Sequence, residues 1–288
     1  MIESVDIIEM MITTDPIMVS HALHRAQGVV IFAGAGMSAE LGIPTYWSGA
    51  SALYSSEKSK YGLTQLEHAD ARLWNKDPEV QSNYFSDLRD SSMDLIKKAG
   101  SENSYSKLSS FLHREAVPYF CVTSNIDNAF ALNGFSENNL YEVHGSLGSS
   151  QCLAEPKNHG VFRSLAGERI ALCPRCSGLA RPNTLFFDDF DFNSSREVEQ
   201  AGAYKTFLSR DMVGYVILEI GAGRTVPRIR DMSTRLHYER DLLYVHLNPA
   251  VDDRDASFML KNNIFDLTTP TAPEIWVQSP SWNAMKML

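Results

Sequence analysis

Three polar side chains that could form an active site follow two apolar runs of the sequence. Asn125 and Asp127 stand two residues apart in TSNID, after the run 119–123, and His144 follows the run 140–143 in EVHGSL. Residues at this spacing can point two short side chains into one pocket, and histidine has its ordinary pKa close to neutral pH. These residue types are ones that an active site could use. An Asx turn is the alternative for Asn125 and Asp127, and a structural role is the alternative for a single histidine.

Two glycine turns could bring the backbone close to a ligand. GAG at 34–36 follows the apolar run 29–33 and leads into the helix-start pattern MSAELG, while GAG at 221–223 ends another apolar run. Backbone N–H groups at a helix start suit a pyrophosphate. The first turn is a poor dinucleotide-binding fingerprint, because Ala39 occupies the third glycine position and Gly42 comes three residues late. A tight strand-to-helix turn without a ligand is the alternative.

Short apolar runs predict the strands that must position these turns. The runs are Val29–Ala33, Tyr119–Thr123, Leu140–Val143, Leu185–Phe187, Tyr215–Ile220 and Leu243–Leu247, with EIWVQ near residue 276 as a further candidate. Most lie far enough apart for helical crossovers, and 64–99 and 196–212 have amphipathic helical patterns, so we expect an α/β fold with a Rossmann-like, mostly parallel sheet. Ligands bind beyond the carboxyl ends of such strands, so AGAGMS, TSNID, EIGAG and HLNPA should share one crevice.

The stretch 148–180 lacks this periodicity and has two cysteine-containing corners with glycine and proline turn signals, which predicts a small, zinc-ribbon-like module inserted between two strands of the main domain. The expected division is a discontinuous Rossmann-like domain at 20–147 and 181–288, the module at 148–180, and an N-terminal extension at 1–19.

Cysteine spacing in the module predicts a metal site with one unusual ligand. Cys173 and Cys176 form a C-x-x-C, whereas the upstream half reads Cys152-Leu-Ala-Glu155. About 17 residues separate Glu155 from Cys173, which fits a zinc ribbon if Glu155 replaces the missing cysteine. His159 is the other candidate for a fourth ligand. A three-cysteine site open to water and a module without metal are the alternatives.

Composition predicts a soluble, intracellular, cytoplasmic protein. The 288-residue chain has 44% hydrophobic and 21% charged residues, and its net charge of −9 argues against nonspecific binding to nucleic acid or to an anionic membrane. Its four cysteines are too few for a disulfide scaffold. No apolar stretch reaches the ~18 residues of a membrane span, and the acidic N-terminus lacks the basic region of a signal peptide.

Taken in order, the motifs resemble those of sirtuins, the Sir2 family of NAD-dependent protein deacylases. GAGMSAELGIPTYW is similar to the family signature GAG-x-S-x-x-x-G-I-P-[DT]-F-R, TSNID to T-Q-N-I-D, and EVHGSL to E-x-H-G-S. RPNTLFFDDF at 181–190 resembles R-P-x-V-V-x-F-G-E, GAG at 221–223 stands where G-T-S is common, and LNP at 247–249 where I-N is common. The resemblance runs from residue 29 to about 250 and covers most of the chain.

The resemblance implies an enzyme that cleaves the nicotinamide–ribose bond of NAD and transfers the ribose to an acyl-lysine oxygen, giving nicotinamide, free lysine and O-acyl-ADP-ribose. It implies that His144 is the general base for a ribose hydroxyl. Asn125 would hold the ribose region and position a water, and Asp127 would accept from the nicotinamide carboxamide. The resemblance therefore implies NAD as co-substrate. In sirtuins the zinc is structural, and the incomplete cysteine set here leaves open whether structural Zn²⁺ is bound.

The expected contacts follow from the same motifs. The residues expected at NAD are Gly34, Ala35, Gly36, Ser38, Pro44, Tyr46, Ser124, Asn125, Asp127, Gly221, Ala222, Gly223, Asn248 and Pro249. The residues expected at an acylated-lysine protein or peptide are Phe187, Asp188, Asp189 and Phe190, with the peptide adding as a strand. The residues expected at the metal are Cys152, Cys173, Cys176 and Glu155.

Some positions depart from the family pattern. Trp47 stands where most sirtuins have an arginine that would pair with phosphate or fix the loop, and Ser124 replaces a glutamine. These departures leave room for a Sir2-type NAD glycohydrolase or ADP-ribosyltransferase. A non-enzymatic NAD sensor is a third alternative, against which the intact Asn125, Asp127 and His144 argue.

The acyl pocket is expected to be apolar. Alignment on DPEV places Phe85 and Leu88 where the desuccinylase branch of sirtuins has tyrosine and arginine. The resemblance therefore implies a pocket for acetyl or longer fatty acyl groups. A one-residue slip of the alignment would instead bring Tyr84 and Arg89 near the acyl group.

Overall fold

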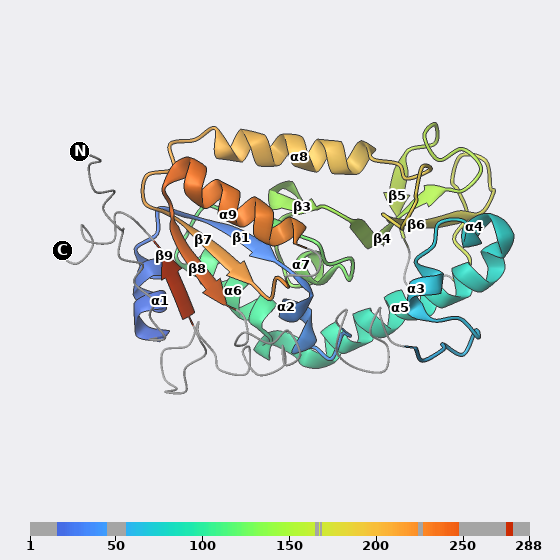
Figure 1. Cartoon of the computed structure of the whole chain (residues 1–288), viewed down its shortest axis with the longest axis horizontal. Helices are drawn as coiled ribbons and strands as arrows, with labels where there is room; N and C mark the ends of the chain where they lie inside the picture. Colours follow the sequence, from blue (N-terminus) through green and yellow to red (C-terminus); the bar gives the residue numbers. More distant parts are fainter. Residues whose placement is uncertain are drawn as a thin grey trace, which may run out of the picture.

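A six-stranded sheet in the order β3-β2-β1-β7-β8-β9 forms the larger part of the structure, a computed structural model that describes residues 16–44, 56–164, 167, 169–223, 227–247 and 275–278 (Figure 1). Its strands are β1 (Gly28–Ala33), β2 (Tyr119–Thr123), β3 (Leu140–Glu142), β7 (Tyr215–Ile220), β8 (Leu243–Leu247) and β9 (Ile275–Gln278). Every neighbouring pair is parallel except β8 with β9. The predicted α/β fold with a mostly parallel sheet is therefore confirmed.

Helices cover both faces of this sheet. The helices of the described residues are α1 (Pro16–His24), α2 (Ala35–Ala39), α3 (Gln65–His68), α4 (Leu73–Lys76), α5 (Pro78–Ala99), α6 (Ser104–Arg114), α7 (Ala129–Leu132), α8 (Ser195–Leu208) and α9 (Arg228–Arg240), with 3₁₀ turns at Gly100–Glu102 and Glu137–Asn139. Val29 and Ile31 of β1 pack in the cluster that includes α1 and α6, whereas Val30 and Phe32 pack with α8 and α9. A strand covered on both faces has a continuous apolar sequence, which is why β1 was readable as a buried run.

The helical pattern predicted for 64–99 is divided among α3, α4 and α5. Pro78 begins α5 at a position where its missing N–H costs nothing, and the Asp77 side chain caps the helix by accepting from the Val80 N–H at 3.2 Å. Gly100, with φ of +59°, ends it. These stop and start signals outweigh the amphipathic pattern that spans them. Among the described residues, no helix has the length and apolar character that crossing a membrane requires.

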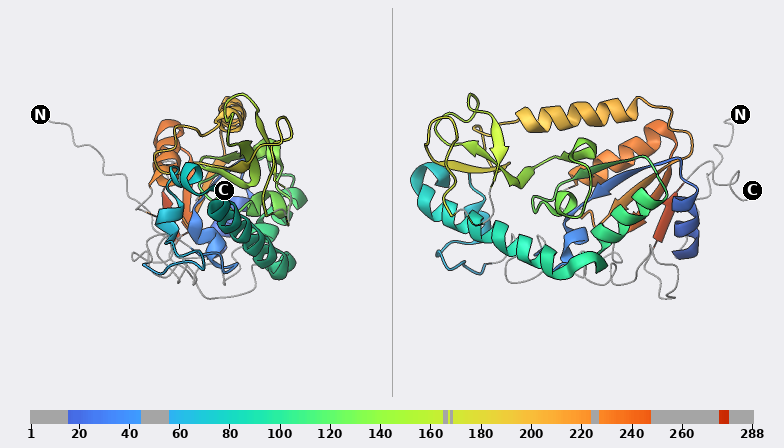
Figure 2. Two further views of the ribbon diagram at one scale, coloured as in Figure 1. Left: turned by 90° about the vertical axis from the view of Figure 1, so that its right-hand side faces the viewer. Right: turned by 180° about the vertical axis from the view of Figure 1, so that it is seen from behind.

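A second, antiparallel sheet lies at one end of the molecule (Figures 1 and 2). Its strands are β4 (Gly145–Cys152), β5 (Val161–Arg163) and β6 (Ala180–Thr184), with β4 in the middle. Helices α5 and α8 both extend from the large sheet toward this small one (Figures 1 and 2).

The predicted strand at Leu185–Phe187 is wrong, because the strand in this region is β6 and belongs to the small sheet. β6 contains Pro182, which a strand tolerates at a sheet edge, and it lacks the apolar pattern of a core strand. The apolar residues that follow it do not enter either sheet. Phe186 is buried, while Leu185 and Phe187 are 40% and 52% exposed.

Candidate active site

The turns after β1 and β7 contact each other through their backbones. The Gly36 N–H donates to the Gly221 carbonyl at 3.0 Å, and the Gly34 N–H donates to the Ile220 carbonyl at 2.9 Å. A Cβ atom at Gly34 would lie 2.5 Å from the Gly221 oxygen, and Gly221 itself has φ of +62°. The close contact between the two turns therefore requires glycine at both positions, independently of any ligand. Figure 1 shows α2 and α7 directly beyond the carboxyl ends of these strands.

A cavity of about 440 Å³ opens beyond the carboxyl ends of β1 and β2 and reaches the small sheet. It draws its walls from the turns after β1 and β2, from α5, and from the segments around β4 and β6. The residues predicted from sequence that line it are Ala35, Ser38, Pro44, Ser124, Asn125, Asp127, His144 and Phe187.

The other predicted NAD-binding residues that the structure describes do not line this cavity. Gly34, Gly36, Gly221 and Ala222 form the adjoining glycine turns, where Gly223 is exposed. Tyr46, Trp47, Asn248 and Pro249 lie outside the described residues.

Asn125 and Asp127 are tied to the turn after β1 by buried hydrogen bonds. Asn125 Nδ2 donates to the Gly34 carbonyl at 3.0 Å and to Ser38 Oγ at 3.1 Å. The Ser38 hydroxyl donates to Asp127 Oδ2 at 2.5 Å, and Asp127 Oδ1 accepts from the Ala129 N–H at 2.8 Å. Burial raises the pKa of Asp127, because these two hydrogen bonds offset the loss of solvation only in part. Asp127 therefore presents a desolvated carboxyl group at the cavity wall.

His144 lies in the turn between β3 and β4 and lines the same cavity. Burial lowers the pKa of His144 and the charge of Arg228 lowers it further, while a hydrogen bond with the Ser124 backbone opposes both. The imidazole is therefore neutral at neutral pH. A neutral imidazole at a cavity wall can accept a proton from a bound hydroxyl.

The far wall of the cavity is mostly apolar. Phe85 and Leu88 of α5, the two residues that the alignment on DPEV assigns to the acyl pocket, both line it. Phe85 packs with Phe186 at a ring-centroid distance of 5.1 Å. Tyr84 also lines the cavity, and burial raises its pKa to about 12. Arg89 does not line this cavity and donates through Nε to the Asp90 carboxylate at 2.9 Å.

The segment after β6, predicted to bind substrate, is held in place by its own contacts. The Phe187 N–H donates to the Ala69 carbonyl at 3.0 Å. The Asp189 carboxylate accepts from Arg181 Nη2 at 2.7 Å, and only 1% of the Asp189 side chain is exposed. Asp188 adopts a left-handed φ of +55°, and Phe190 is 86% exposed. The Asp189 side chain cannot reach a peptide at the surface, so Asp189 can act only through its backbone or by holding the loop.

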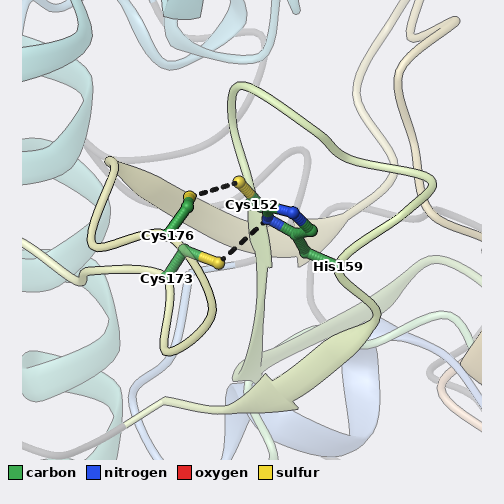
Figure 3. A group of neighbouring side chains, drawn as sticks. All are labelled: Cys152, His159, Cys173 and Cys176. Atoms are coloured by element: carbon green, nitrogen blue, oxygen red, sulfur yellow. Dashed lines mark hydrogen bonds between the residues drawn. The ribbon is translucent and has the colours of Figure 1, made fainter.

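Three cysteines and one histidine converge in the small module (Figure 3). Cys152, His159, Cys173 and Cys176 have their ligand atoms within 4.8 Å of one another. Glu155 does not belong to this group, and its carboxylate instead accepts from Asn158 Nδ2 at 2.7 Å. His159 rather than Glu155 therefore completes the cluster, a choice that spacing along the chain could not make.

Two separations in the cluster are close to those of a tetrahedral zinc site. The sulfurs of Cys152 and Cys176 are 3.7 Å apart, and Cys173 Sγ lies 3.4 Å from His159 Nδ1. Ligand bonds of about 2.0–2.3 Å at tetrahedral angles imply separations of about 3.8 Å between sulfurs and about 3.6 Å between sulfur and nitrogen. Burial opposes ionisation of Cys173, but the backbone N–H groups of Arg175 and Cys176 lower its pKa to about 6. A thiolate is the form that binds metal.

Sequence reasoning did not single out Tyr105 or Thr184. Thr184 lines the cavity, whereas Tyr105 does not line it but contacts Ser38 and Asn125 through its hydroxyl. A tyrosine in an amphipathic helix has the pattern of an ordinary core residue, so no sequence signal marked it.

Comparison with known proteins agrees with this geometry. The sequence model of the Sir2 family matches residues 34–207. A Pseudomonas aeruginosa protein named NAD-dependent protein deacylase 2 is 27% identical over 172 residues, which cover 59% of this chain and 64% of that protein. A Pseudomonas syringae pv. tomato protein of the same name is 25% identical over 237 residues, which cover 82% of this chain and 89% of that protein. The first of these matches thus spans less than two-thirds of its relative.

Solved structures share the fold. The structure of a Sir2 homolog–NAD complex superimposes with a TM-score of 0.54 at 20% identity, covering 83% of this chain and 84% of that one. Identity at this level supports a common fold and no finer conclusion.

Proposed function

The chain belongs to the Sir2 family, and from that premise we propose that it is an NAD-dependent protein-lysine deacylase. The observation that carries the proposal is the placement of Asn125, Asp127 and His144, from two separate turns, around one cavity. Bound NAD would supply an activated sugar carbon for transfer to the acyl oxygen of a lysine side chain. The products would be nicotinamide, free lysine and O-acyl-ADP-ribose.

His144 is the proposed general base. Its lowered pKa keeps the ring able to accept a proton at neutral pH. The hydrogen bond with the Ser124 backbone occupies one ring nitrogen. Only the unprotonated nitrogen of a neutral imidazole can accept a proton. The other ring nitrogen is therefore the one available to a ribose hydroxyl.

Asn125 and Asp127 are the proposed binding residues for the reacting end of NAD. Asp127 is desolvated and has no cationic partner among its hydrogen bonds, so an amide N–H₂ group would satisfy it without neutralising it. Asn125 is fixed by its bonds to Gly34 and Ser38, which suits a residue that must hold a sugar or a water in one position. The glycine turns at 34–36 and 221–223, with Asn248 and Pro249, are proposed for the rest of NAD.

The acyl group is proposed to be apolar. Phe85, Leu88 and Ile126 line the far part of the cavity, and no arginine of the described residues lines it. A carboxylate on the acyl chain would lose its hydration there without gaining a cation. A panel of peptides acylated with acetyl, longer fatty acyl and succinyl groups tests this, and a clear preference for succinyl-lysine would contradict it.

The metal proposal is a structural zinc ion held by Cys152, His159, Cys173 and Cys176. The cluster lies in the small module, and none of its four residues lines the cavity. Zinc would therefore stabilise the module and take no part in the chemistry. Metal analysis should give about one zinc per chain, and Cys176→Ser should lose zinc and lower the melting temperature, whereas the matched change Cys121→Ser, in β2, should retain zinc.

Mass spectrometry of the NAD products, with and without an acetyl-lysine peptide, tests the proposed reaction. O-acetyl-ADP-ribose that forms only when peptide is present supports the deacylase. ADP-ribose and nicotinamide released equally without peptide would instead favour a Sir2-type NAD glycohydrolase, the alternative that the Trp47 and Ser124 departures leave room for.

A further inference from the structure

We propose that Tyr105 is a positioning residue that orients Ser38 and Asn125 for the reaction, an inference that rests on the proposed deacylase function. Tyr105 lies on α6 and is completely buried. Its hydroxyl lies 2.7 Å from Ser38 Oγ and 3.2 Å from Asn125 Nδ2. It does not line the cavity, so it would act through these two neighbours and not on the substrate.

The donors and acceptors in this cluster can be ordered because each hydroxyl has one proton. Ser38 gives its proton to the Asp127 carboxylate, so Ser38 Oγ must accept from the Tyr105 hydroxyl. Tyr105 has then used its own proton and can only accept from Asn125 Nδ2, whose two protons are shared among Gly34, Ser38 and Tyr105. The result is a directed chain of hydrogen bonds from Asn125 through Tyr105 and Ser38 to Asp127.

This chain of hydrogen bonds fixes which way the Asn125 amide faces. The Gly34 carbonyl can only accept, so the group 3.0 Å from it must be the Asn125 N–H₂. Tyr105 and Ser38 hold that same group on the inner side. Because Asn125 lines the cavity, its Oδ1 is left as the acceptor for a ligand there. Without Tyr105, the amide would keep fewer of the contacts that prevent its rotation.

Tyr105 suits this role because its ring is fixed and its proton is retained. The ring packs edge-on against Phe130 at a centroid distance of 4.9 Å. Burial, together with the charge of Asp127, raises the pKa of Tyr105 well above its usual value, so the phenol remains a donor throughout the pH range in which the protein would act. A phenylalanine would keep the packing and remove only the hydroxyl.

The test compares Tyr105→Phe with a matched change, Tyr119→Phe. Tyr119 is a buried tyrosine of β2 whose hydroxyl accepts from the Ser136 N–H at 3.1 Å, outside the cavity. We expect Tyr105→Phe to lower kcat/KM for NAD about tenfold, the size of one lost hydrogen bond to a buried network. The KM for acetylated peptide and the melting temperature should change little, and Tyr119→Phe should leave kcat/KM near the wild-type value.

A double-mutant cycle separates positioning from general stability. In a Ser38→Ala background the hydrogen-bond chain from Asn125 to Asp127 is already interrupted, so Tyr105→Phe should lower kcat/KM less than about threefold. Equal effects of the two tyrosine changes, full additivity with Ser38→Ala, or a loss explained entirely by a lower melting temperature would overturn the proposal.

Calorimetric binding of ADP-ribose distinguishes failure of this inference from failure of the proposed function. A wild-type protein that binds ADP-ribose but turns over no acyl peptide, with weaker binding only in Tyr105→Phe, would remove the deacylase function and retain the positioning role. Equal binding in wild type and Tyr105→Phe, with equal turnover, would overturn the positioning role alone. A wild type that neither binds ADP-ribose nor consumes NAD would overturn both.

Discussion

Two buried carboxyl groups, Asp127 and Glu219, lie near the carboxyl ends of β2 and β7, the two parallel strands that flank β1, yet their surroundings differ. Within the described part of the chain, Asp127 accepts only from the Ser38 hydroxyl and the Ala129 N–H. Glu219 accepts from His246 Nδ1 at 2.7 Å, from Arg230 Nε at 3.3 Å, and from the hydroxyls of Tyr244 and Ser233. Both lie in the interior, but only Glu219 has a cationic side chain beside it.

The pKa values of the two groups shift in opposite directions for this reason. Burial raises the pKa of Asp127, and its two hydrogen bonds do not restore it. Burial also pushes the pKa of Glu219 upward, but the hydrogen bond and charge of His246, with the hydroxyls of Ser233 and Tyr244, outweigh burial and leave it lowered. A carboxyl group that the protein leaves uncompensated beside a cavity is characteristic of a functional site, whereas a fully compensated one is characteristic of structure.

The structural carboxylate also supports the functional region. Arg230, which pairs with Glu219, donates through Nη2 to the Ala222 carbonyl at 2.6 Å. Ala222 belongs to the glycine turn that contacts Gly34. The Glu219 network therefore holds α9, β8 and this turn together, whereas Asp127 lines the cavity.

The largest effect should come from Asp127→Asn. This change removes the negative charge proposed to bind the nicotinamide carboxamide and replaces one acceptor oxygen with an N–H₂ donor, so kcat/KM for NAD should fall about 10²–10³-fold, the usual cost of losing a key polar contact at a reacting centre. Stability should stay the same or increase, because a desolvated charge is removed. Steady-state kinetics and urea unfolding measure the two effects. A large loss of stability would mean that Asp127, like Glu219, is structural.

Glu219→Gln should show the opposite pattern. Loss of the charge leaves Arg230 without its buried partner, so the free energy of unfolding should fall by about 2–4 kcal/mol. The matched change Glu239→Gln, at an exposed pair with Arg235 on α9, should cost less than about 0.5 kcal/mol. Urea unfolding measures both. Loss of activity without loss of stability in Glu219→Gln would break the distinction between the two acids.

The pH dependence of stability gives a smaller, signed effect. Glu219 has a pKa below its ordinary 4.5, so its contribution is present above pH 4.5 and is lost as pH falls through the lowered value. Asp127 has a pKa above its ordinary 3.8, so folding favours its protonated form, and that contribution is lost as pH rises through the raised value. Each slope is at most about 1.4 kcal/mol per pH unit.

The two variants should each remove one of these slopes. Stability can be measured by urea unfolding from about pH 3 to about pH 7. As the pH falls, Glu219→Gln should lose less stability than the wild type does. Asp127→Asn should show a smaller decline in stability above pH 3.8. Identical pH profiles in both variants would contradict the assignment of opposite shifts.

The sequence predicted the parts of this molecule that follow from local patterns. β1, β2 and β7 were readable because strands buried on both faces are continuously apolar. The turns after them carry Gly34, Asn125 and Gly221, and parallel strands necessarily bring such turns to one edge.

What the sequence missed depends on contacts between distant segments. Leu185–Phe187 has the composition of a strand, but its aromatic residues border a cavity instead. Glu155 fits the ligand spacing, yet the chain turns to place His159 in the cluster. In the sequence, Tyr105 has the pattern of an ordinary core residue, and Glu219 is a charged residue within an apolar run. Their roles become clear only from their partners on other elements.

The central claim is that His144 acts as the base in a cavity that holds both NAD and an acylated lysine. The most direct test is the rate of O-acetyl-ADP-ribose formation from NAD and acetyl-lysine peptide in wild type and His144→Ala. We predict formation that requires the peptide and falls about 10²–10⁴-fold in the variant, with ADP-ribose binding retained. Unchanged product formation in His144→Ala, or no peptide-dependent product in the wild type, would contradict the account.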